Sequence, residues 1–257
     1  MSMSKIRVRC RDIVQALIKI GLEAGDAVML HSSLSSMGHV EGGALAVVEA
    51  FLEVLGPEGT FMVPTFTHSG TKYFDPLESP SKNGAITEAA RKYPGAVRSL
   101  HPTHAVTVIG ANAEKLVQDD LERGPLGKDC ALDRLSAQGG YVFLLGVGHE
   151  ANSGIHVGED YAGDPDRYKH WSTEHPKRVI LNHPEKGEIE ILITSMMGST
   201  AAFEKMEEEL RARGLIVDGM IGMAQCQLMK AQAVVDATID ILRPILKPVG
   251  GADEHHC

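Results

Sequence analysis

Short apolar runs alternate with stretches of helical periodicity along most of this chain, and this alternation constrains the fold more than any other feature of the sequence. The runs predicted as buried strands are residues 26–31, 59–64, 105–109 and 141–145. Between them, stretches such as 41–55 place apolar residues three or four positions apart, which is the spacing of an amphipathic helix. Strands that alternate with helices predict a layered α/β fold.

The last third of the chain adds a different kind of element. Residues 178–182 and 188–194 flank Glu185-Lys-Gly187 as the strands of a hairpin do, and residues 220–229 predict one more strand. We expect these antiparallel strands to join the sheet, which is therefore predicted to be mixed. Further helices are predicted at residues 12–22, 111–119, 131–137, 200–213 and 234–245.

Nothing in the sequence divides the chain into separate units. It has no internal repeat, low-complexity run or Gly/Ser linker. We predict a single domain over residues 1–250 followed by a flexible tail, residues 251–257. Residues 65–83 are rich in Thr, Ser, Pro and Gly and predict a long loop, and loops of that length in compact domains are often functional.

Composition restricts the partners. The net charge of -9 disfavours nucleic acid, whose binding needs a cationic surface, and suits a cationic substrate. No run approaches the roughly 18 apolar residues of a membrane span. The four cysteines include no CxxC pair. These features predict a cytoplasmic protein with reduced thiols and no membrane partner.

The loop after the first predicted strand concentrates hydroxyl groups. His31 ends that strand, and a run of serines precedes the helix start at Gly42-Gly43: Ser32, Ser33, Ser35 and Ser36. Hydroxyls and free N–H groups at a helix N-terminus bind anions, so one interpretation is a site for a phosphorylated cofactor. The other is an ordinary turn in which serines satisfy orphan amides.

A second polar segment precedes the strand at 105–109. Arg98 can grip a phosphate or a carboxylate with paired donors. His101 and His104 suggest a metal site, but they lie in a Pro-containing turn and further ligands are not evident. His149-Glu150 and the terminal residues 254–257 are no better constrained, so we predict no metal.

The third segment follows the strand at 141–145 and contains a candidate base. If a helix begins at Ser153, His156 shares a side with Glu159 and Asp160. An amine must lose a proton to attack a thioester, and histidine titrates near neutrality, which suits it as the base. The alternative is a pair buried only to satisfy each other. No nucleophile elbow, Walker loop or Rossmann fingerprint appears.

Five motifs in one order carry a family resemblance: His31–Gly38, Glu41–Ala44, His101–Ala105, Gly146–Gly148 and Ser153–Glu159. The chain resembles the aminoglycoside 3-N-acetyltransferases, also called antibiotic N-acetyltransferases, from about Ile13 to about Ile245. The resemblance implies a three-layer α/β/α fold with a mixed sheet, unrelated to the GNAT acetyltransferases. It also implies acetyl-CoA as the donor and no metal requirement.

The resemblance assigns roles to residues as well. It implies that His156 is the base, Glu159 its acidic partner and His31 an assisting group, in direct transfer to the 3-amino group of an aminoglycoside, a reaction of antibiotic resistance. Oxyanion donors are expected near Ser33 or Ser153. The residues implied to contact the donor are His31, Ser32, Ser33, Leu34, Gly42, Gly43, Thr103 and Ser153.

Two departures leave parts of this assignment open. Cys130 stands where the family usually has Ser followed by Pro. The acceptor loops have no diagnostic pattern, and we predict Asp160 and Asp164 as acceptor ligands, with Asp166 and Glu174 as further carboxylates. The rival functions are acetylation of another small amine such as an aminophosphonate, a metal-dependent amidohydrolase, and a donor-binding protein without activity. Monomer and homodimer both fit.

Overall fold

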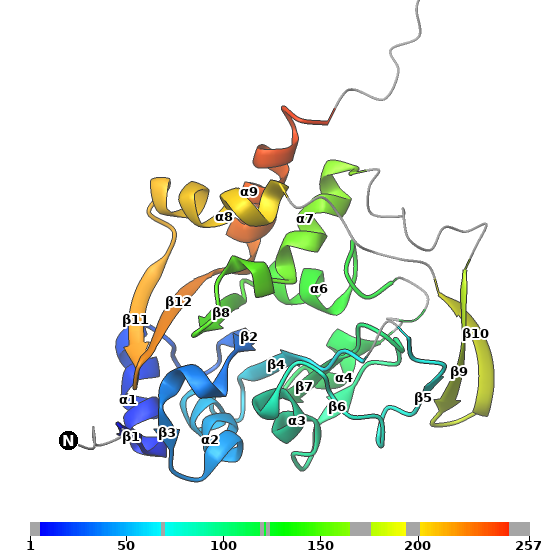
Figure 1. Cartoon of the computed structure of the whole chain (residues 1–257), viewed down its shortest axis with the longest axis horizontal. Coiled ribbons are helices and arrows are strands. Elements are labelled where there is room, and N and C mark those ends of the chain that lie inside the picture. Colours follow the sequence, from blue (N-terminus) through cyan, green and yellow to red (C-terminus); the bar gives the residue numbers. More distant parts are fainter. Residues whose placement is uncertain are drawn as a thin grey trace, which may run out of the picture.

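A seven-stranded mixed sheet forms the centre of the fold (Figure 1). The computed structural model describes residues 6–67, 70–118, 121, 124–164, 176–193 and 201–246. In spatial order the strands are β11 (Val217–Ile221), β12 (Ala224–Lys230), β8 (Tyr141–Leu145), β2 (Ala27–Ser32), β4 (Thr60–Pro64), β7 (Val106–Gly110) and β6 (Val97–Arg98). β2 pairs in parallel with β4 and β8, and the other neighbours are antiparallel. The predicted mixed sheet is confirmed.

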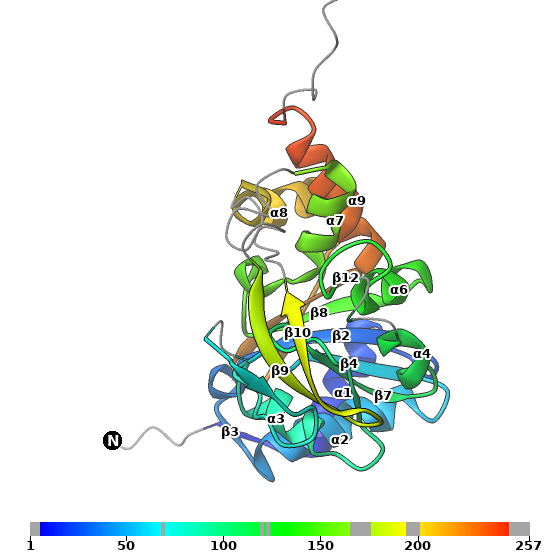
Figure 2. The ribbon, with the colours of Figure 1, turned by 90° about the vertical axis from the view of Figure 1, so that its right-hand side faces the viewer.

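Helices cover both faces of this sheet, which gives three layers (Figures 1 and 2). One face carries α1 (Cys10–Ile20), α2 (Gly43–Leu55) and α3 (Ala85–Arg91). The other carries α4 (Ala113–Val117), α6 (Ala131–Ala137), α7 (Gly154–Ala162), α8 (Ala201–Ala212) and α9 (Ala231–Leu242). The helices predicted from periodicity are confirmed, with ends shifted by up to three residues.

The central strands are apolar on both sides because both sides are buried. In β2, Val28 and Leu30 pack in the core beneath α1 and α2, whereas Met29 packs in the core beneath α6 and α9. Successive side chains of a strand point to opposite faces. His31 therefore points to the same face as Met29, and Ser32 to the same face as Leu30.

Close packing of α7 on α9 fixes the helix that carries His156. The contact is made at Gly158, where a Cβ atom would lie 2.4 Å from Cβ of Thr238. A larger residue at this position would force the two helices apart. The glycine thus sets the distance of α7 from the rest of the layer.

The prediction that the hairpin near residues 178–194 joins the central sheet is wrong. β9 (Lys177–His183) and β10 (Gly187–Ile193) form a separate sheet with β5 (Tyr73–Phe74), a short strand inside the predicted loop 65–83. Figure 1 shows this sheet at one end of the molecule, and in Figure 2 the same end faces the viewer. Its strands bury alternate residues against a small core around Phe74, a pattern that fits a sheet with one solvated face.

The single strand predicted at 220–229 is also corrected, because it is the β11–β12 hairpin. Gly222 forms its turn with φ 60°, and a Cβ there would lie 2.3 Å from the carbonyl oxygen of Met37. Two short parallel strands, β1 (Arg7–Val8) and β3 (His39–Val40), and the 3-10 helices Leu34–Met37 and His149–Ala151 complete the described elements. None of the described helices has the length and apolarity needed to cross a membrane. The predicted tail, residues 251–257, lies outside the described residues.

Candidate active site

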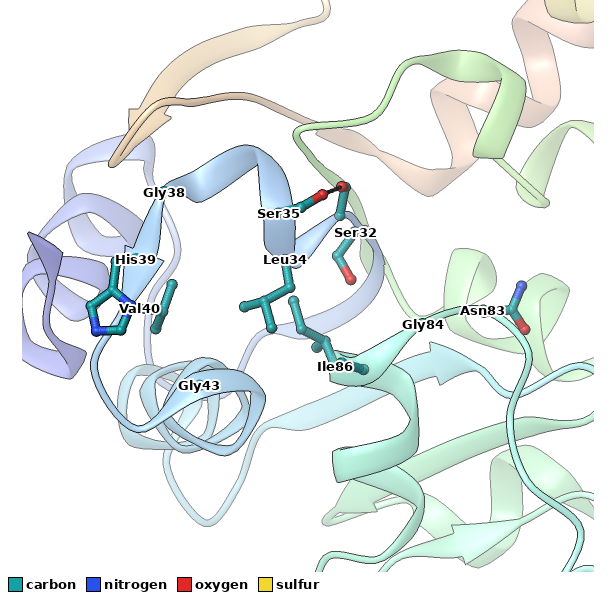
Figure 3. Close-up of a pocket in the computed structure, with 12 residues that line it drawn as sticks. Ser32, Leu34, Ser35, Gly38, His39, Val40, Gly43, Asn83, Gly84 and Ile86 are labelled. Atoms are coloured by element: carbon teal, nitrogen blue, oxygen red, sulfur yellow. Dashed lines mark hydrogen bonds between the residues drawn. The ribbon is translucent and has the colours of Figure 1, made fainter. Parts of the chain in front are cut away.

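Two cavities meet at the end of β2. The larger, about 590 Å³, is lined by residues 32–35, 38–40, 43 and 83–86 (Figure 3). The smaller, about 250 Å³, is lined by His31, Ser32, Pro64, Phe66, Asn83, Thr87, Glu150, Ala151, Ser153, His156 and Phe203. Ser32 and Asn83 line both. His31, whose side chain points to the opposite face of β2 from that of Ser32, lines only the smaller cavity.

The larger cavity is walled by backbone, hydroxyls and small apolar groups. Its serines come from the loop after β2, and Gly43 lies at the first turn of α2, where backbone N–H groups have no helical partner. Gly42 and Gly43 have φ of 83° and 62°, a conformation that favours glycine. No atom lies within 4 Å of a Cβ built on Gly43. The cavity therefore suits a neutral chain that carries hydrogen-bonding groups and an anion.

His156 and Glu159 form a pair on α7 at the wall of the smaller cavity. His156 Nδ1 lies 2.7 Å from Glu159 Oε2, and the exposed fractions of the two side chains are 19% and 0%. A carboxylate oxygen accepts, so Nδ1 is the donor and Nε2 is the nitrogen able to take a proton. The other carboxylate oxygen, Oε1, is buried and has no hydrogen-bond partner within the described ranges. The i, i+3 spacing predicted from the sequence thus brings the two side chains into contact.

His31 lines the same cavity as a buried, neutral imidazole. Burial lowers its pKa to about 3, with a smaller contribution from His149. Its Nε2 is buried, and no other described residue is a hydrogen-bond partner for it. His31 can exchange a hydrogen bond with a bound molecule but carries no charge at neutral pH.

A cluster of polar residues backs this cavity without lining it. The Thr103 hydroxyl lies 2.9 Å from His104 Nδ1 and 3.4 Å from His101 Nδ1, and it lines neither cavity. Burial lowers the pKa of His101 to about 3 and that of His104 to about 4. The His104 ring contacts the Phe66 ring, with centroids 5.0 Å apart. Within the described ranges, no group of three or more His, Cys, Asp or Glu side chains is placed to hold a metal ion.

Arg98 is placed to hold the loop rather than a ligand. Its guanidinium donates to the carbonyl oxygens of Thr65 and Ser79, at 2.5 Å each, and to that of Pro76, and it lies 4.9 Å from the Phe74 ring centroid. Burial lowers its pKa to about 10. Arg98 thereby fastens loop 65–83, whose two ends supply Phe66 and Asn83 to the smaller cavity.

The remaining residues predicted to contact the donor are divided between the two cavities. Leu34 and Ser33 line the larger cavity, and Gly42 adjoins it, whereas Ser153 lines the smaller one beside His156. Cys130 is buried at the start of α6, away from both linings.

The predicted acceptor ligands lie outside both linings. Asp160 accepts from the Lys128 N–H at 2.8 Å, and Asp164 is buried. Asp166 and Glu174 fall outside the described residues. Both Asp160 and Asp164 stay predictions.

Sequence reasoning missed Asn83 and Glu150. Asn83 Oδ1 accepts from the Phe66 N–H at 2.7 Å, across 17 residues of chain. Glu150 Oε1 accepts from the Gly148 N–H at 2.9 Å, and Glu150 is the acidic side chain among the described lining residues of the smaller cavity. No local pattern marks either residue as part of a site, because only the fold brings them to the cavity wall.

Sequence comparison with known proteins points to one family of enzymes. The family model described as aminoglycoside 3-N-acetyltransferase matches residues 29–243. Aminoglycoside N(3)-acetyltransferase VII of Streptomyces paromomycinus is 33% identical over 254 residues, covering 87% of this chain and 88% of that protein. Aminoglycoside N(3)-acetyltransferase IV of Salmonella sp is 27% identical, covering 97% and 95%.

Solved structures agree. The aminoglycoside acetyltransferase AAC(3)-IVa apoenzyme superposes with a TM-score of 0.83 at 26% identity, covering 99% of this chain and 97% of that one. AAC(3)-Xa gives a TM-score of 0.81 at 27% identity, covering 92% and 93%. The mixed sheet and its helical layers are therefore shared with enzymes of this kind.

Proposed function

The chain belongs to the aminoglycoside 3-N-acetyltransferase family, and from that premise we propose that it transfers an acetyl group from acetyl-CoA to an amine of an aminoglycoside, with His156 as the general base. One observation carries the proposal beyond family membership. The two cavities share Ser32 and Asn83 in their linings, and His156, paired with Glu159, lines the smaller one. A donor and an acceptor can therefore meet beside a base.

The larger cavity fits the donor. Pantetheine is a neutral chain of amides, and the cavity offers serine hydroxyls, backbone N–H groups and the apolar Leu34. The N-terminus of α2 provides partial positive charge for phosphate groups. When bound, acetyl-CoA would supply a thioester whose carbonyl carbon bonds to the amine nitrogen and whose C–S bond then breaks, with CoA leaving as the thiolate. Ser33, Leu34, Gly42 and Gly43 are the residues that would hold it.

His156 removes the proton that the amine must lose. Glu159 accepts from Nδ1–H, which keeps the lone pair on Nε2 and stabilises the imidazolium that forms after proton transfer. His156 also contacts Phe203, with ring centroids 5.1 Å apart, so the ring is held from two sides. A fixed orientation of the base contributes to the rate because no orientational entropy is then lost in reaching the transition state.

The smaller cavity is the proposed acceptor site. Glu150 places a carboxylate at its wall, and a carboxylate attracts ammonium groups of a polycation. A mutant of AAC(3)-IVa, which is 25% identical to this chain with a TM-score of 0.81, has been solved in complex with a gentamicin. An acceptor of that class fits a site with one carboxylate beside a base. Asp160 and Asp164 are assigned to more distant parts of the same acceptor.

The test follows thiol release from acetyl-CoA with a panel of aminoglycosides and an aminophosphonate, for the wild type and His156→Ala. We expect turnover with an aminoglycoside, insensitive to chelator, and a loss in the mutant of about 10²–10⁴-fold in kcat, the usual contribution of a general base. CoA binding by calorimetry should survive in the mutant. Activity only with the aminophosphonate, or CoA binding without any turnover, would overturn the aminoglycoside assignment.

A further inference from the structure

Ser32 and Asn83 line both cavities, and neither the Ser32 hydroxyl nor the Asn83 side-chain NH2 group donates a hydrogen bond to another described residue. We propose that the Ser32 hydroxyl and the Asn83 side-chain amide form the oxyanion hole of the acetyl transfer. This inference rests on the proposed function and adds two catalytic residues to it. Figure 3 shows both residues at the end of the larger cavity opposite His39 and Val40.

Ser32 is distinguished from its neighbouring serines by having no internal partner. The Ser33 and Ser35 hydroxyls lie 3.2 Å apart, and Ser36 donates to the Ser33 carbonyl at 2.7 Å. Ser32 Oγ is buried and has no hydrogen-bond partner among the described residues. Burying an unsatisfied hydroxyl destabilises a fold, so a serine here suggests a partner that arrives with the substrate.

Asn83 is oriented by the backbone of loop 65–83. The Phe66 N–H can only donate, so the amide atom 2.7 Å from it is the oxygen, and the Nδ2 group remains as the side-chain donor of this lining residue. The Lys82 N–H donates to the Phe66 carbonyl at 2.8 Å, which adds a second bond between the two ends of the loop. The donor is therefore held in place before any ligand binds, as an oxyanion hole requires.

The position of the pair matches where charge develops. As the amine nitrogen bonds to the acetyl carbon, an electron pair of the carbonyl moves onto its oxygen, and it returns when the C–S bond breaks. The amine proton goes to His156 and CoA leaves as the thiolate. Acetyl transfer has to cross the boundary between the cavities. Ser33 lines only the larger cavity and Ser153 only the smaller, so Ser32 and Asn83 replace them as the oxyanion donors.

The test compares Ser32→Ala, Asn83→Asp and the control Ser136→Ala. Asn83→Asp keeps an oxygen for the Phe66 N–H and removes the donor. Each of the first two should lower kcat by about 10²–10³-fold, with the Kd for CoA changed by less than about threefold. Ser32→Ala should be at least as stable as the wild type because it removes a buried unsatisfied hydroxyl.

Ser136→Ala is expected to show the opposite pattern. The Ser136 hydroxyl, on α6 and outside both linings, donates to Gln232 at 3.0 Å, so its loss should lower the unfolding temperature and leave kcat unchanged. Wild-type kcat in Ser32→Ala, or a loss of kcat that follows a loss of CoA binding, would overturn the proposal. A wild-type enzyme without turnover on any amine would instead overturn the proposed function.

Discussion

The two cavities that meet at Ser32 differ in how they are built. Most of the larger one comes from one continuous stretch, residues 32–43, completed by residues 83–86. The smaller draws its walls from β2, β4, both ends of loop 65–83, the segment 150–156 and α8. Binding of a long donor can thus be encoded locally in a loop and a helix start. The walls around the base come from several elements, and only the fold assembles them.

The two cavities also differ in their ionisable groups. His39, which is exposed, is the ionisable side chain among the described residues lining the larger cavity. The smaller is lined or backed by His31, His101 and His104, whose pKa values burial lowers to between about 3 and about 4. Because these three imidazoles are neutral at neutral pH, they add no positive charge near His156.

Glu159→Gln should abolish proton transfer at the smaller cavity and leave CoA binding in the larger cavity unchanged. A glutamine amide can donate to His156 Nδ1 and force the proton onto Nε2, which removes the base. We expect kcat to fall about 10²–10⁴-fold with the Kd for CoA unchanged. Unfolding stability should change little, because the amide fills the same space and removes a buried charge. Glu207→Gln, on the exposed face of α8, is the control, and equal losses in both variants would contradict the assignment.

Acid should destabilise the protein because the buried histidines that line or back the smaller cavity are neutral when folded and take up protons on unfolding. The pKa values of His31, His101 and His104 are lowered to about 3, 3 and 4, and the unfolded value is about 6.5. Between these limits the unfolded chain binds protons that the folded chain does not, so stability falls as pH drops from 7 to 5. Each histidine contributes up to about 1.4 kcal/mol per pH unit.

Urea unfolding at several pH values measures this slope. His101→Gln should reduce the proton uptake on unfolding by one, which lowers the slope of the unfolding free energy against pH by about 1.4 kcal/mol per pH unit. The variant also loses the contact of His101 with Thr103. A slope equal to that of the wild type would show that His101 is protonated in the folded state.

Gly43→Ala should weaken CoA binding in the larger cavity and leave acceptor binding in the smaller cavity unchanged. The new methyl group enters open space at the cavity wall, and the positive φ of 62° adds strain. We expect the Kd for CoA to rise about tenfold, equivalent to about 1.4 kcal/mol, with little change in the KM of the acceptor. Gly214→Ala is a matched control, with φ 66° and equally open surroundings outside both linings. A tenfold change in both variants would indicate a general effect of strain.

Glu150→Gln should give the smallest effect and sharpen the acceptor assignment. It removes the carboxylate from the wall of the smaller cavity while an amide oxygen can still accept from Gly148. Because Glu150 is exposed, we expect only about a three- to fivefold rise in the KM of a polycationic acceptor. The rise should disappear at high salt, and Glu23→Gln should leave KM unchanged. A salt-independent rise would point to a change of shape instead.

Parts of this site could be predicted because their geometry is local. His156 and Glu159 are three residues apart on one helix, so the helical repeat alone brings them together. The serine loop and the Gly42-Gly43 start of α2 are contiguous as well. The continuous apolar runs of β2 and β8 likewise predicted buried strands, because a strand buried on both faces is apolar at every position.

What the sequence determined by itself is therefore the local part: the α/β alternation, the helix that carries the base and its partner, and the loop proposed to hold the donor. Tertiary structure alone decided that the β9–β10 hairpin pairs with β5 through β9 and that Arg98 donates to loop carbonyls 19 to 33 residues away. It also decided that Asn83 and Ser32 line the same two cavities. These contacts join residues far apart in the chain. Their partners are set by packing, which no short pattern of residues encodes.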